Sequence, residues 1–539
     1  MANYNSKILT TAVSSLHAQQ AAIATTANNI ANVNTPGYSR RTLELETRAT
    51  DSLGSGLNLG NGVEIGGLVR RIDSFLVKLV REAAGADRRY AAEDAFLARL
   101  EPLFAFEGDF LTIGSALNSF YAAMNDLALN PSDLSLRANV IQQAENLVES
   151  IHTTYNTLAQ LQTDADLRIE TEINTINAIT AQIAELNGAI RTRESTGNLA
   201  ADERDQRDHL LEKLAEKMSF SVTELSDGTV TISLANGFAL VTSNTSRALE
   251  FNRTPSFAVG GVPQSLAGGN LGYIVYDHSQ GGGTSHQDLT SLFAAGDGSI
   301  GGLLRMRGTI DADASLTPFD ANGVLPELAA RVESLTRTLL VDFNYTYYAP
   351  NAAGNPTSGD LNSNPPQAFG LFSWIGNPNR DGPAVTIGDL DPAITGKVVY
   401  SSILNVVPTR AERICAGRDP TGTSPPVVPK GDGSNARAMA GLRTRSFLFE
   451  VGGFSLTGTT AEFYDQTVGT VGNLRNASRV NVLVAQANLA TAQQRRDEVS
   501  GVSLDEEFTV LIKHQRAFEA AARLIKVADD LMQQVVNVI

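Results

Sequence analysis

The two ends of this 539-residue chain carry matching apolar repeats, and this match constrains the fold more than any other feature. Near the N-terminus four apolar residues stand seven apart, with companions at Ala12, Gln19, Thr26 and Val33: Leu9, Leu16, Ile23 and Ile30. Near the C-terminus the spacing alternates by four and three: Leu504, Phe508, Leu511, Gln515, Phe518, Ala522, Ile525, Asp529, Met532, Val536 and Ile539. A repeat of about 3.5 residues keeps two helices in contact along a supercoil. The sequence therefore predicts that the two ends pair as a coiled coil and carry the rest of the chain as an insertion.

Two polar residues, Gln515 and Asp529, stand in the C-terminal seam where apolar residues are expected. Buried polar residues in such a seam can set helix register or partner number, at a cost in stability. Alternatively, Asp529 faces water if the seam rotates towards Leu524, Ala528, Leu531, Val535 and Val538. The sequence alone leaves both interpretations open.

The first helix is expected over residues 6–33, and a turn is expected to end it. Pro36 disfavours the helical conformation at Thr35, and the pair Pro36–Gly37 suits the centre of a type II turn. Residues 42–72 are rich in glycine, with apolar residues between the glycines. This composition favours short strands and turns.

Helix dominates residues 73–218, with breaks expected near Pro102 and Pro131. The helical pattern after Pro131 continues to about Glu194, which is too long for an ordinary globular helix without supercoiling or a kink. A further helix is expected over about 201–218, where opposite charges stand four residues apart.

The chain changes character after residue 218. Alternating apolar residues around the turn Asp227–Gly228 predict a β-hairpin, and β-like composition continues to about residue 276. Residues 326–347 and 461–496 are expected to be helical, and the loop-rich segment 348–435 lies between them. The predicted fold class is mainly α with inserted β-rich domains.

Four domains are predicted. They are a terminal coiled coil (1–35 with 505–539), a helical bundle domain (36–218 with 300–347 and 461–504), a β-rich domain (219–299) and a mixed insertion domain (348–460).

Composition excludes several classes of function. The formal net charge of -16 argues against a protein that binds the phosphate backbone of nucleic acid or binds a membrane through a polybasic segment. A single cysteine, Cys415, excludes an internal disulfide framework and a cysteine-based zinc site. The chain has no apolar run of about 18 residues and no N-terminal signal peptide pattern, so composition by itself predicts a cytoplasmic protein.

The motifs of enzyme chemistry are weak here. Residues 296–301 satisfy G-x-G-x-x-G, and Asp320 follows at a suitable distance, but no predicted strand precedes the first glycine. His278 and His286 flank a glycine run at a spacing that fits no known metal site. His17, His152, His209 and His514 lie on predicted helices. We therefore predict no catalytic residue, no cofactor site and no metal site.

The segment Ala27-Asn28-Asn29-Ile30-Ala31-Asn32-Val33-Asn34-Thr35-Pro36-Gly37-Tyr38-Ser39-Arg40 closely resembles the N-terminal motif of bacterial flagellar rod, hook and hook-associated proteins. Its ending, Tyr-Ser-Arg, is most similar to the hook-associated members. Four other segments resemble the same family: 69–76, 199–214, 431–436 and 500–507. Arg41 stands where the family often has Gln, and residues 345–430 match poorly.

The resemblance implies a non-enzymatic subunit of the junction between hook and filament, located outside the cell. It implies export through the flagellar type III apparatus without cleavage of a signal, which reverses the cytoplasmic prediction from composition. The implied partners are the hook protein, the next junction protein, copies of the chain in a ring, and a cytoplasmic chaperone that holds the C-terminal region. Nucleic acid and membrane are not among them. The terminal helices are expected to be poorly ordered in the monomer and to become ordered on docking.

The residues expected to form the assembly interface come from the two seams and the Asn-rich motif: Leu9, Leu16, Ile23, Ile30, Asn28, Asn29, Asn32, Asn34, Pro36, Gly37, Tyr38, Leu504, Phe508, Leu511, Phe518, Ile525, Met532 and Val536. Two alternatives remain. One is a hook or distal rod protein, which shares the first motif but not the long helices. The other is a secreted enzyme or adhesin on a flagellar scaffold, which would place its site in residues 345–460.

Overall fold

The structure is a computed structural model that describes residues 2–49, 51–52, 58–104, 111–254, 265–277, 286–309, 322–349, 370–374, 399–419, 427–451 and 454–538. The chain divides into two compact units. Unit 1 contains Met1–Asp87, Thr175–Ala248 and Val484–Ile539, and unit 2 contains Arg88–Asn174 and Leu249–Leu483. The division falls within three helices: α2 (Ser74–Leu100), α4 (Leu134–Glu194) and α12 (Thr460–Ser500).

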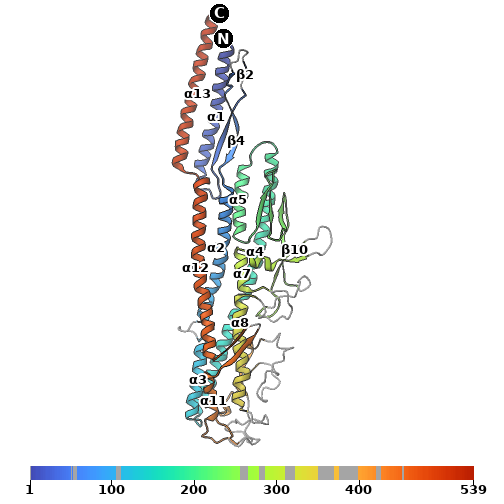
Figure 1. Ribbon diagram of the computed structural model, residues 1–539, viewed down its shortest axis with the longest axis vertical. Helices are drawn as coiled ribbons and strands as arrows, with labels where there is room; N and C mark the ends of the chain where they lie inside the picture. The colour runs from blue at the N-terminus through green and yellow to red at the C-terminus, as the bar shows by residue number, and fades with distance from the viewer. Residues whose placement is uncertain are drawn as a thin grey trace. The chain divides into compact units, whose positions relative to one another are not determined.

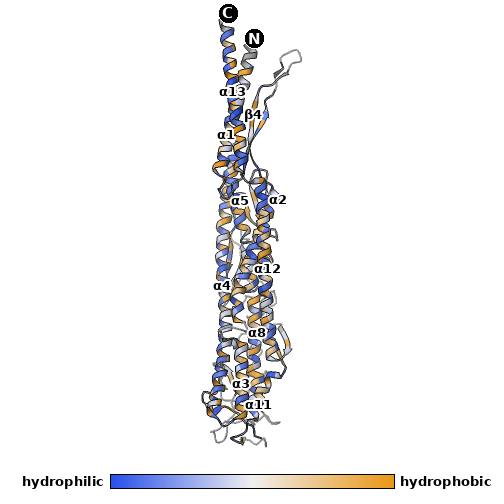
Figure 2. Ribbon diagram, turned by 90° about the vertical axis from the view of Figure 1, so that its left-hand side faces the viewer, coloured by the Kyte–Doolittle hydropathy of each residue, from blue (hydrophilic) through white to orange (hydrophobic). Residues whose placement is uncertain are grey.

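Unit 1 contains the two terminal helices, α1 (Ala2–Ala31) and α13 (Leu504–Val538), which lie antiparallel and side by side (Figure 1 and Figure 2). A hairpin of β1 (Arg41–Thr47) and β4 (Val63–Arg70) packs beside α1, with Arg41 opposite Arg70 and a bulge between Glu44 and Leu45. The remaining elements are β2 (Asp51–Ser52), β3 (Asn58–Leu59), α5 (Ala201–Ala215), β5 (Ser221–Glu224), β6 (Val230–Ser233), β7 (Ala239–Thr242) and β8 (Thr245–Ser246). Strands β5 to β8 form one antiparallel sheet in chain order.

The seam between α1 and α13 is made largely of small residues. Along the described part of α13 the buried side chains are Glu507, Ala521 and Ala528, and half-buried His514 completes their spacing of seven residues. On α1 the buried residues are Ala12, Ala18, Ala22, Thr26 and Asn29. Small side chains allow two helices to approach closely, but each removes little apolar area from water, so this seam contributes modest hydrophobic stabilisation. The predicted pairing of the two ends is confirmed, with a polar residue in place of an apolar one at Glu507 and at His514.

Unit 2 is built from helices and small sheets. Its helices are α3 (Ile113–Leu129), α6 (Thr290–Ala295), α7 (Ser299–Arg307), α8 (Val324–Thr338), the π-helix η3 (Leu339–Phe343), α9 (Asn344–Tyr348), α11 (Ser434–Gly441), and the short 3-10 turns Glu101–Leu103, Tyr400–Ser402, Ala411–Arg413 and Leu442–Thr444. Its strands are β9 (Leu249–Asn252), β10 (Tyr273–Asp277), β11 (His286–Asp288), β12 (Phe372–Trp374), β13 (Leu404–Val406), β14 (Phe447–Val451) and β15 (Phe454–Gly458). They form the sheet β11-β10-β9 and the hairpins β12–β13 and β14–β15.

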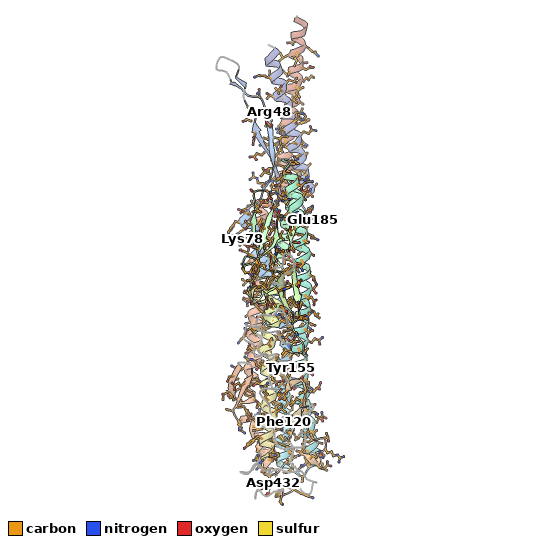
Figure 3. All side chains as sticks on the ribbon, turned by 90° about the vertical axis from the view of Figure 1, so that its right-hand side faces the viewer. Arg48, Lys78, Phe120, Tyr155, Glu185 and Asp432 are labelled. Carbon is orange, nitrogen blue, oxygen red and sulfur yellow. The ribbon has the colours of Figure 1, made fainter. Side chains whose placement is uncertain are left out.

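The core of unit 2 concentrates the few aromatic residues of the chain. Phe120 and Phe343 stack with ring centroids 6.4 Å apart, and Phe449 stacks on Phe463 at 4.2 Å (Figure 3 labels Phe120). A buried carboxylate, Glu333, accepts hydrogen bonds from the amides of Tyr400 and Ser401, the latter at 2.9 Å. Unit 2 therefore has a core of its own, independent of the terminal seam.

The structure confirms the predicted long helices. It also shows what the G-x-G-x-x-G segment forms. Helix α4 spans 61 residues, close to the predicted limits. The glycines of residues 296–301 connect α6 to α7, with Gly298 at φ 93° before α7. A dinucleotide site needs a strand before the first glycine, and here a helix precedes it. The four predicted domain boundaries stay a prediction.

Candidate functional site: the network that joins the two ends

The Asn-rich motif forms a rigid turn after α1. The side-chain amide of Asn32 donates to the Asn28 carbonyl oxygen at 3.0 Å, and the Thr35 hydroxyl donates to Asn32 Oδ1 at 3.1 Å. The Tyr38 amide donates to the Thr35 carbonyl at 3.2 Å, which closes a four-residue turn. Gly37 has φ +81°, the value that the third position of a type II turn requires and that other residues rarely adopt. A Cβ at Gly37 would lie 3.1 Å from His209 Cβ, so the turn also sits close to α5.

Asn29 lies at the centre of the site, with 1% of its surface exposed. Its Nδ2 donates to the Arg41 carbonyl oxygen and to Glu507 Oε2, each at 2.9 Å. Its Oδ1 accepts from the Tyr38 hydroxyl at 2.8 Å and from the Arg41 amide at 3.1 Å. All four hydrogen-bonding positions of this amide are therefore used. Asn29 therefore connects Tyr38 and Arg41, which follow α1, to Glu507 in the first turn of α13.

Arg40 holds the start of α13 from the other side. Its Nε donates to Glu507 Oε1 and its Nη1 to Glu506 Oε2, each at 2.7 Å. The Glu507 side chain is 2% exposed, whereas the Glu506 side chain is 62% exposed. The Glu507 carboxylate is thus buried but fully compensated, because one oxygen faces a guanidinium and the other an amide.

A second cluster of charges attaches the same turn to α5. Asp205 of α5 accepts from the Ser39 hydroxyl at 2.6 Å, from Arg41 Nη2 at 2.9 Å and from Arg70 Nε at 2.9 Å. Arg70 also pairs with Asp208 at 2.5 Å. The side chains of Arg41, Arg70 and Asp205 are each less than a tenth exposed. Each of these buried charges has an opposite charge beside it. Without that partner, the cost of removing the charge from water would not be compensated.

The pKa values of Tyr38 and Arg41 reflect this enclosure. Burial raises the pKa of the Tyr38 hydroxyl above its usual value, against the opposing effect of the Arg41 guanidinium. Burial alone would lower the pKa of Arg41, but its hydrogen bonds to Asp202 and Asp205 outweigh burial and raise it. Tyr38 therefore keeps the proton that it donates to Asn29, and Arg41 keeps its charge.

We call this set of side chains the terminal latch: Asn29, Tyr38, Ser39, Arg40, Arg41, Arg70, Asp205, Asp208 and Glu507. Beside it lies a cavity of about 660 Å³, lined in part by Pro36, His209 and Ser503. The latch brings together four segments that are separate in the sequence: residues 29–41, Arg70, residues 205–208 and Glu507. It is an arrangement for fixing the relative position of helices, with no nucleophile and general base placed for catalysis among these side chains.

The structure places the expected interface residues in three groups. Leu9, Leu16, Ile23, Ile30, Asn32, Tyr38, Leu511, Phe518, Ile525 and Met532 are half-buried. Asn28, Asn34, Pro36, Gly37, Leu504 and Phe508 are exposed, and only Asn29 is buried. The side chain of Val536 lies outside the described residues, although α13 includes its backbone. Gln515 and Asp529 are exposed, which favours the interpretation that Asp529 faces water.

Sequence reasoning missed most of the latch. Arg40, Arg41, Arg70, Asp205 and Glu507 each look like an ordinary charged surface residue when read alone. A usable signal existed: Arg40, Arg70, Asp205 and Glu507 lie in segments that share the same family resemblance, and Arg41 directly follows one of them, although the segments are far apart in the chain. Their common resemblance is explained by their contact.

The other candidate residues from the sequence give little support for a functional site. His286 lies in β11, while His278 and Asp320 lie outside the described residues. No group of three His, Cys, Asp or Glu side chains suited to a metal occurs in the described part of the chain. Cys415 is buried in unit 2. Among the described helices, none combines the length and apolar character that crossing a membrane requires.

Three family models match the chain. "Flagellar hook-associated protein FlgK helical domain" matches residues 97–356, "Flagella basal body rod protein" matches 9–38, and "Flagellar basal body rod FlgEFG protein C-terminal" matches 493–538. The two terminal matches contain most of α1 and all of α13.

The chain is also similar to curated proteins over its whole length. It is 27% identical to flagellar hook-associated protein 1 of Bacillus subtilis, over 98% of this chain and 97% of that protein. It is 27% identical to flagellar hook-associated protein 1 of Salmonella typhimurium, over 99% of this chain and 100% of that protein. A solved structure, that of the flagellar hook junction protein FlgK from Burkholderia pseudomallei, matches 78% of this chain and 100% of its own with a TM-score of 0.56 and 15% identity. This last match supports the fold.

Proposed function

This chain belongs to the flagellar hook-associated protein family and is a structural component of the bacterial flagellum, and on this premise we propose that it forms the junction between hook and filament, assembled through its terminal helices. The observation that carries the proposal is the 2.9 Å bond between Asn29 and Glu507, which joins the Asn-rich motif to the C-terminal helix. A protein that must transmit a defined helix arrangement to its neighbours needs such a fixed point.

The surface of α13 supports assembly with neighbours. Large apolar side chains remain exposed along it: Phe508 50%, Ile512 51%, Leu524 51%, Val527 53% and Leu531 39%. Several large apolar side chains exposed along one helix are typical of an interaction site. We propose that neighbouring subunits cover it, and that this burial completes the ordering of the two terminal helices.

The proposed partners follow from this role. They are the hook protein on one side, the next junction protein on the other, and copies of the chain in a closed ring with head-to-tail contacts. We further propose that the chain is exported through the flagellar type III apparatus without a cleaved signal and works outside the cell. A cytoplasmic chaperone that holds the C-terminal helix before export would cover the same exposed apolar residues. No catalytic role is proposed.

Deletion of the chain tests the junction role. Cells without it should build hooks of normal length, lack filaments and release flagellin into the medium, and the full chain supplied in trans should restore filaments. Loss of the hooks themselves would favour the alternative of a hook or rod protein. Filaments that persist on the hooks of the deletion strain would contradict the proposal.

A truncation tests the part that the terminal helices play. Removal of residues 505–539 should leave unit 2 folded, because its aromatic core contains none of these residues. The truncated chain should unfold cooperatively in a thermal melt and fail to restore filaments. A motile strain carrying the truncation would show that α13 is dispensable for assembly.

A further inference from the structure

A groove in unit 1 lies between α1 and the β1–β4 hairpin, with a volume of about 590 Å³. Its apolar wall is formed by Leu9 and Val13 of α1 and by Val63 and Ile65 of β4. Val13 is 37% exposed and Ile65 is 44% exposed. Two further lining residues, His17 and Arg48, are exposed and basic (Figure 3 labels Arg48).

The walls of the groove are fixed in place. The Val63 amide donates to the Ser14 hydroxyl at 3.2 Å, which ties the hairpin to α1. Gly62, next to Val63, has φ +89° and lies so close to α1 that a Cβ there would come 3.2 Å from Thr11 Cα. The groove is therefore a preformed surface, and it keeps its shape without an occupant.

The chain's own α13 cannot fill this groove. Gln19 of α1 contacts His514 of α13 at 2.7 Å, and Asn29 holds Glu507, so α13 runs along the other side of α1. Val13 stands one residue after Ala12, which is buried in the seam, and successive residues of a helix point about 100° apart. The groove and the side of α1 that contacts α13 are thus different faces of α1, and buried Ala18 belongs to the groove.

The outward face of α13 has the character that fits the groove. Phe508 and Ile512 are half exposed and stand four residues apart on one face of the helix. Asp505 and Glu519 are exposed on the same face, three residues before Phe508 and seven after Ile512. This face therefore presents two large apolar side chains between two carboxylates, with the exposed Arg516 beside Glu519. The groove presents an apolar wall beside two basic residues and one carboxylate, because Glu64 also lines it and lies 3.8 Å from Arg48.

We propose that the groove of one copy receives Phe508 and Ile512 of a second copy of this chain, with Asp505 and Glu519 facing Arg48 and His17. This inference rests on the proposed assembly function and names the surfaces that it uses. Because groove and outward face are different surfaces of the same unit, the contact is heterologous. Each copy places its α13 face in the groove of one neighbour and accepts the α13 face of another neighbour in its own groove. Contacts of this kind therefore link copies in series.

Cysteine cross-linking in assembled flagella tests the contact. Two variants, Val13→Cys and Ile512→Cys, are made in separate full-length chains that also carry Cys415→Ala, and both are expressed together in the deletion strain. Oxidation of isolated hook–filament junctions should give a covalent dimer of the chain when both variants are present. The dimer should be lost when either variant is expressed alone, because a heterologous contact never brings two copies of one position together.

A matched control and a contrary outcome complete the test. Lys513 is exposed and adjacent to Ile512 but points about 100° away, so Lys513→Cys with Val13→Cys should give no dimer. Dimers from Val13→Cys alone, or cross-links from Val13→Cys to the hook protein instead, would overturn the proposal. Normal filaments with no cross-link would refute this contact and leave the junction function standing. Absence of the chain from isolated flagella would refute both.

Discussion

Asn29 and Glu507 stand 478 residues apart in the chain, and a 2.9 Å hydrogen bond joins the amide of one to the carboxylate of the other. The same Glu507 receives the guanidinium of Arg40 through its second oxygen. The register between α1 and α13 is thus set at one end by polar contacts of fixed geometry, and further along the seam a hydrogen bond between Gln19 and His514 stands among buried alanines. Substitutions at this polar end should therefore destabilise the helix pair more than the small area buried there would suggest.

Replacing Asn29 with Ala should destabilise the pairing of α1 with α13. The change leaves buried groups of Glu507, Tyr38 and Arg41 without partners, at about 1–3 kcal/mol for each unsatisfied group. Asn34→Ala, at an exposed position of the same motif, serves as control and should change stability by less than about 0.5 kcal/mol. Thermal unfolding followed by circular dichroism measures both, and equal effects would argue against a special role for Asn29.

Asp205 and Asp202 provide a matched pair of carboxylates, since Arg41 Nη2 contacts both. The Asp205 side chain is 8% exposed and also holds Arg70, whereas the Asp202 side chain is 67% exposed. Asp205→Ala should cost about 3–5 kcal/mol, because it leaves buried guanidinium charge uncompensated. Asp202→Ala should cost about 1 kcal/mol or less. Denaturant unfolding curves of the two variants should differ accordingly.

The turn after α1 should be sensitive to a single methyl group. Gly37→Ala places a Cβ at φ +81° and 3.1 Å from His209 Cβ, so we expect a loss of about 1–2 kcal/mol from backbone strain alone. Gly60→Ala is the control, because its φ is not left-handed and no described atom lies within 4 Å of the added carbon. If thermal melts of the two variants coincide, the turn tolerates the side chain and the argument is wrong.

Acidification should weaken the helix pair through His514. Burial lowers the pKa of His514 below its usual value near 6.5, and neighbouring Lys513 acts in the same direction. Below pH 6.5 the unfolded chain therefore binds more protons than the folded one, so stability falls as the pH drops towards the folded-state pKa and levels off beneath it. Helix melts between pH 8 and pH 5 should show this decline in the parent chain and a smaller one in His514→Gln. Exposed His17→Gln should behave like the parent.

The rate of amide hydrogen exchange should increase along the terminal helices with distance from the latch. In the monomer, residues near the latch should be the best protected part of α1 and α13, and the residues furthest from it should exchange fastest, because only the alanine seam holds them. Assembled junctions should protect the distant residues as well. Uniformly strong protection of both helices in a verified monomer would contradict ordering on docking.

The sequence predicted the pairing of the two ends because heptad spacing is a local property that numbering alone displays. Four residues expected in the seam, Leu511, Phe518, Ile525 and Met532, are half-buried, whereas buried Glu507 and His514, the partner of Gln19, were not expected there. A glutamate and a histidine at those positions are recognisable as interior residues only when their partners are known. Those partners, Asn29 and Gln19, lie nearly five hundred residues away.

The charge cluster on α5 shows a second limit of the sequence. Asp205 reads as one of several acidic residues on a solvated helix face, and Arg41 reads as an ordinary strand residue. Their burial depends on a third segment, β4, which brings Arg70 to the same place. Three segments must fold together before any of these charges is compensated, so no single window of sequence contains the information.

The hydrogen bond between Asn29 and Glu507 can form only in a chain that extends to Glu507. A chain whose synthesis stops just before Glu507 contains the Asn-rich motif and most of both units, yet it leaves the second donor of Asn29 without this carboxylate. Such a product also lacks the α13 partners of Arg40 and Gln19. The completed latch therefore distinguishes a chain that includes α13 from a slightly shorter one.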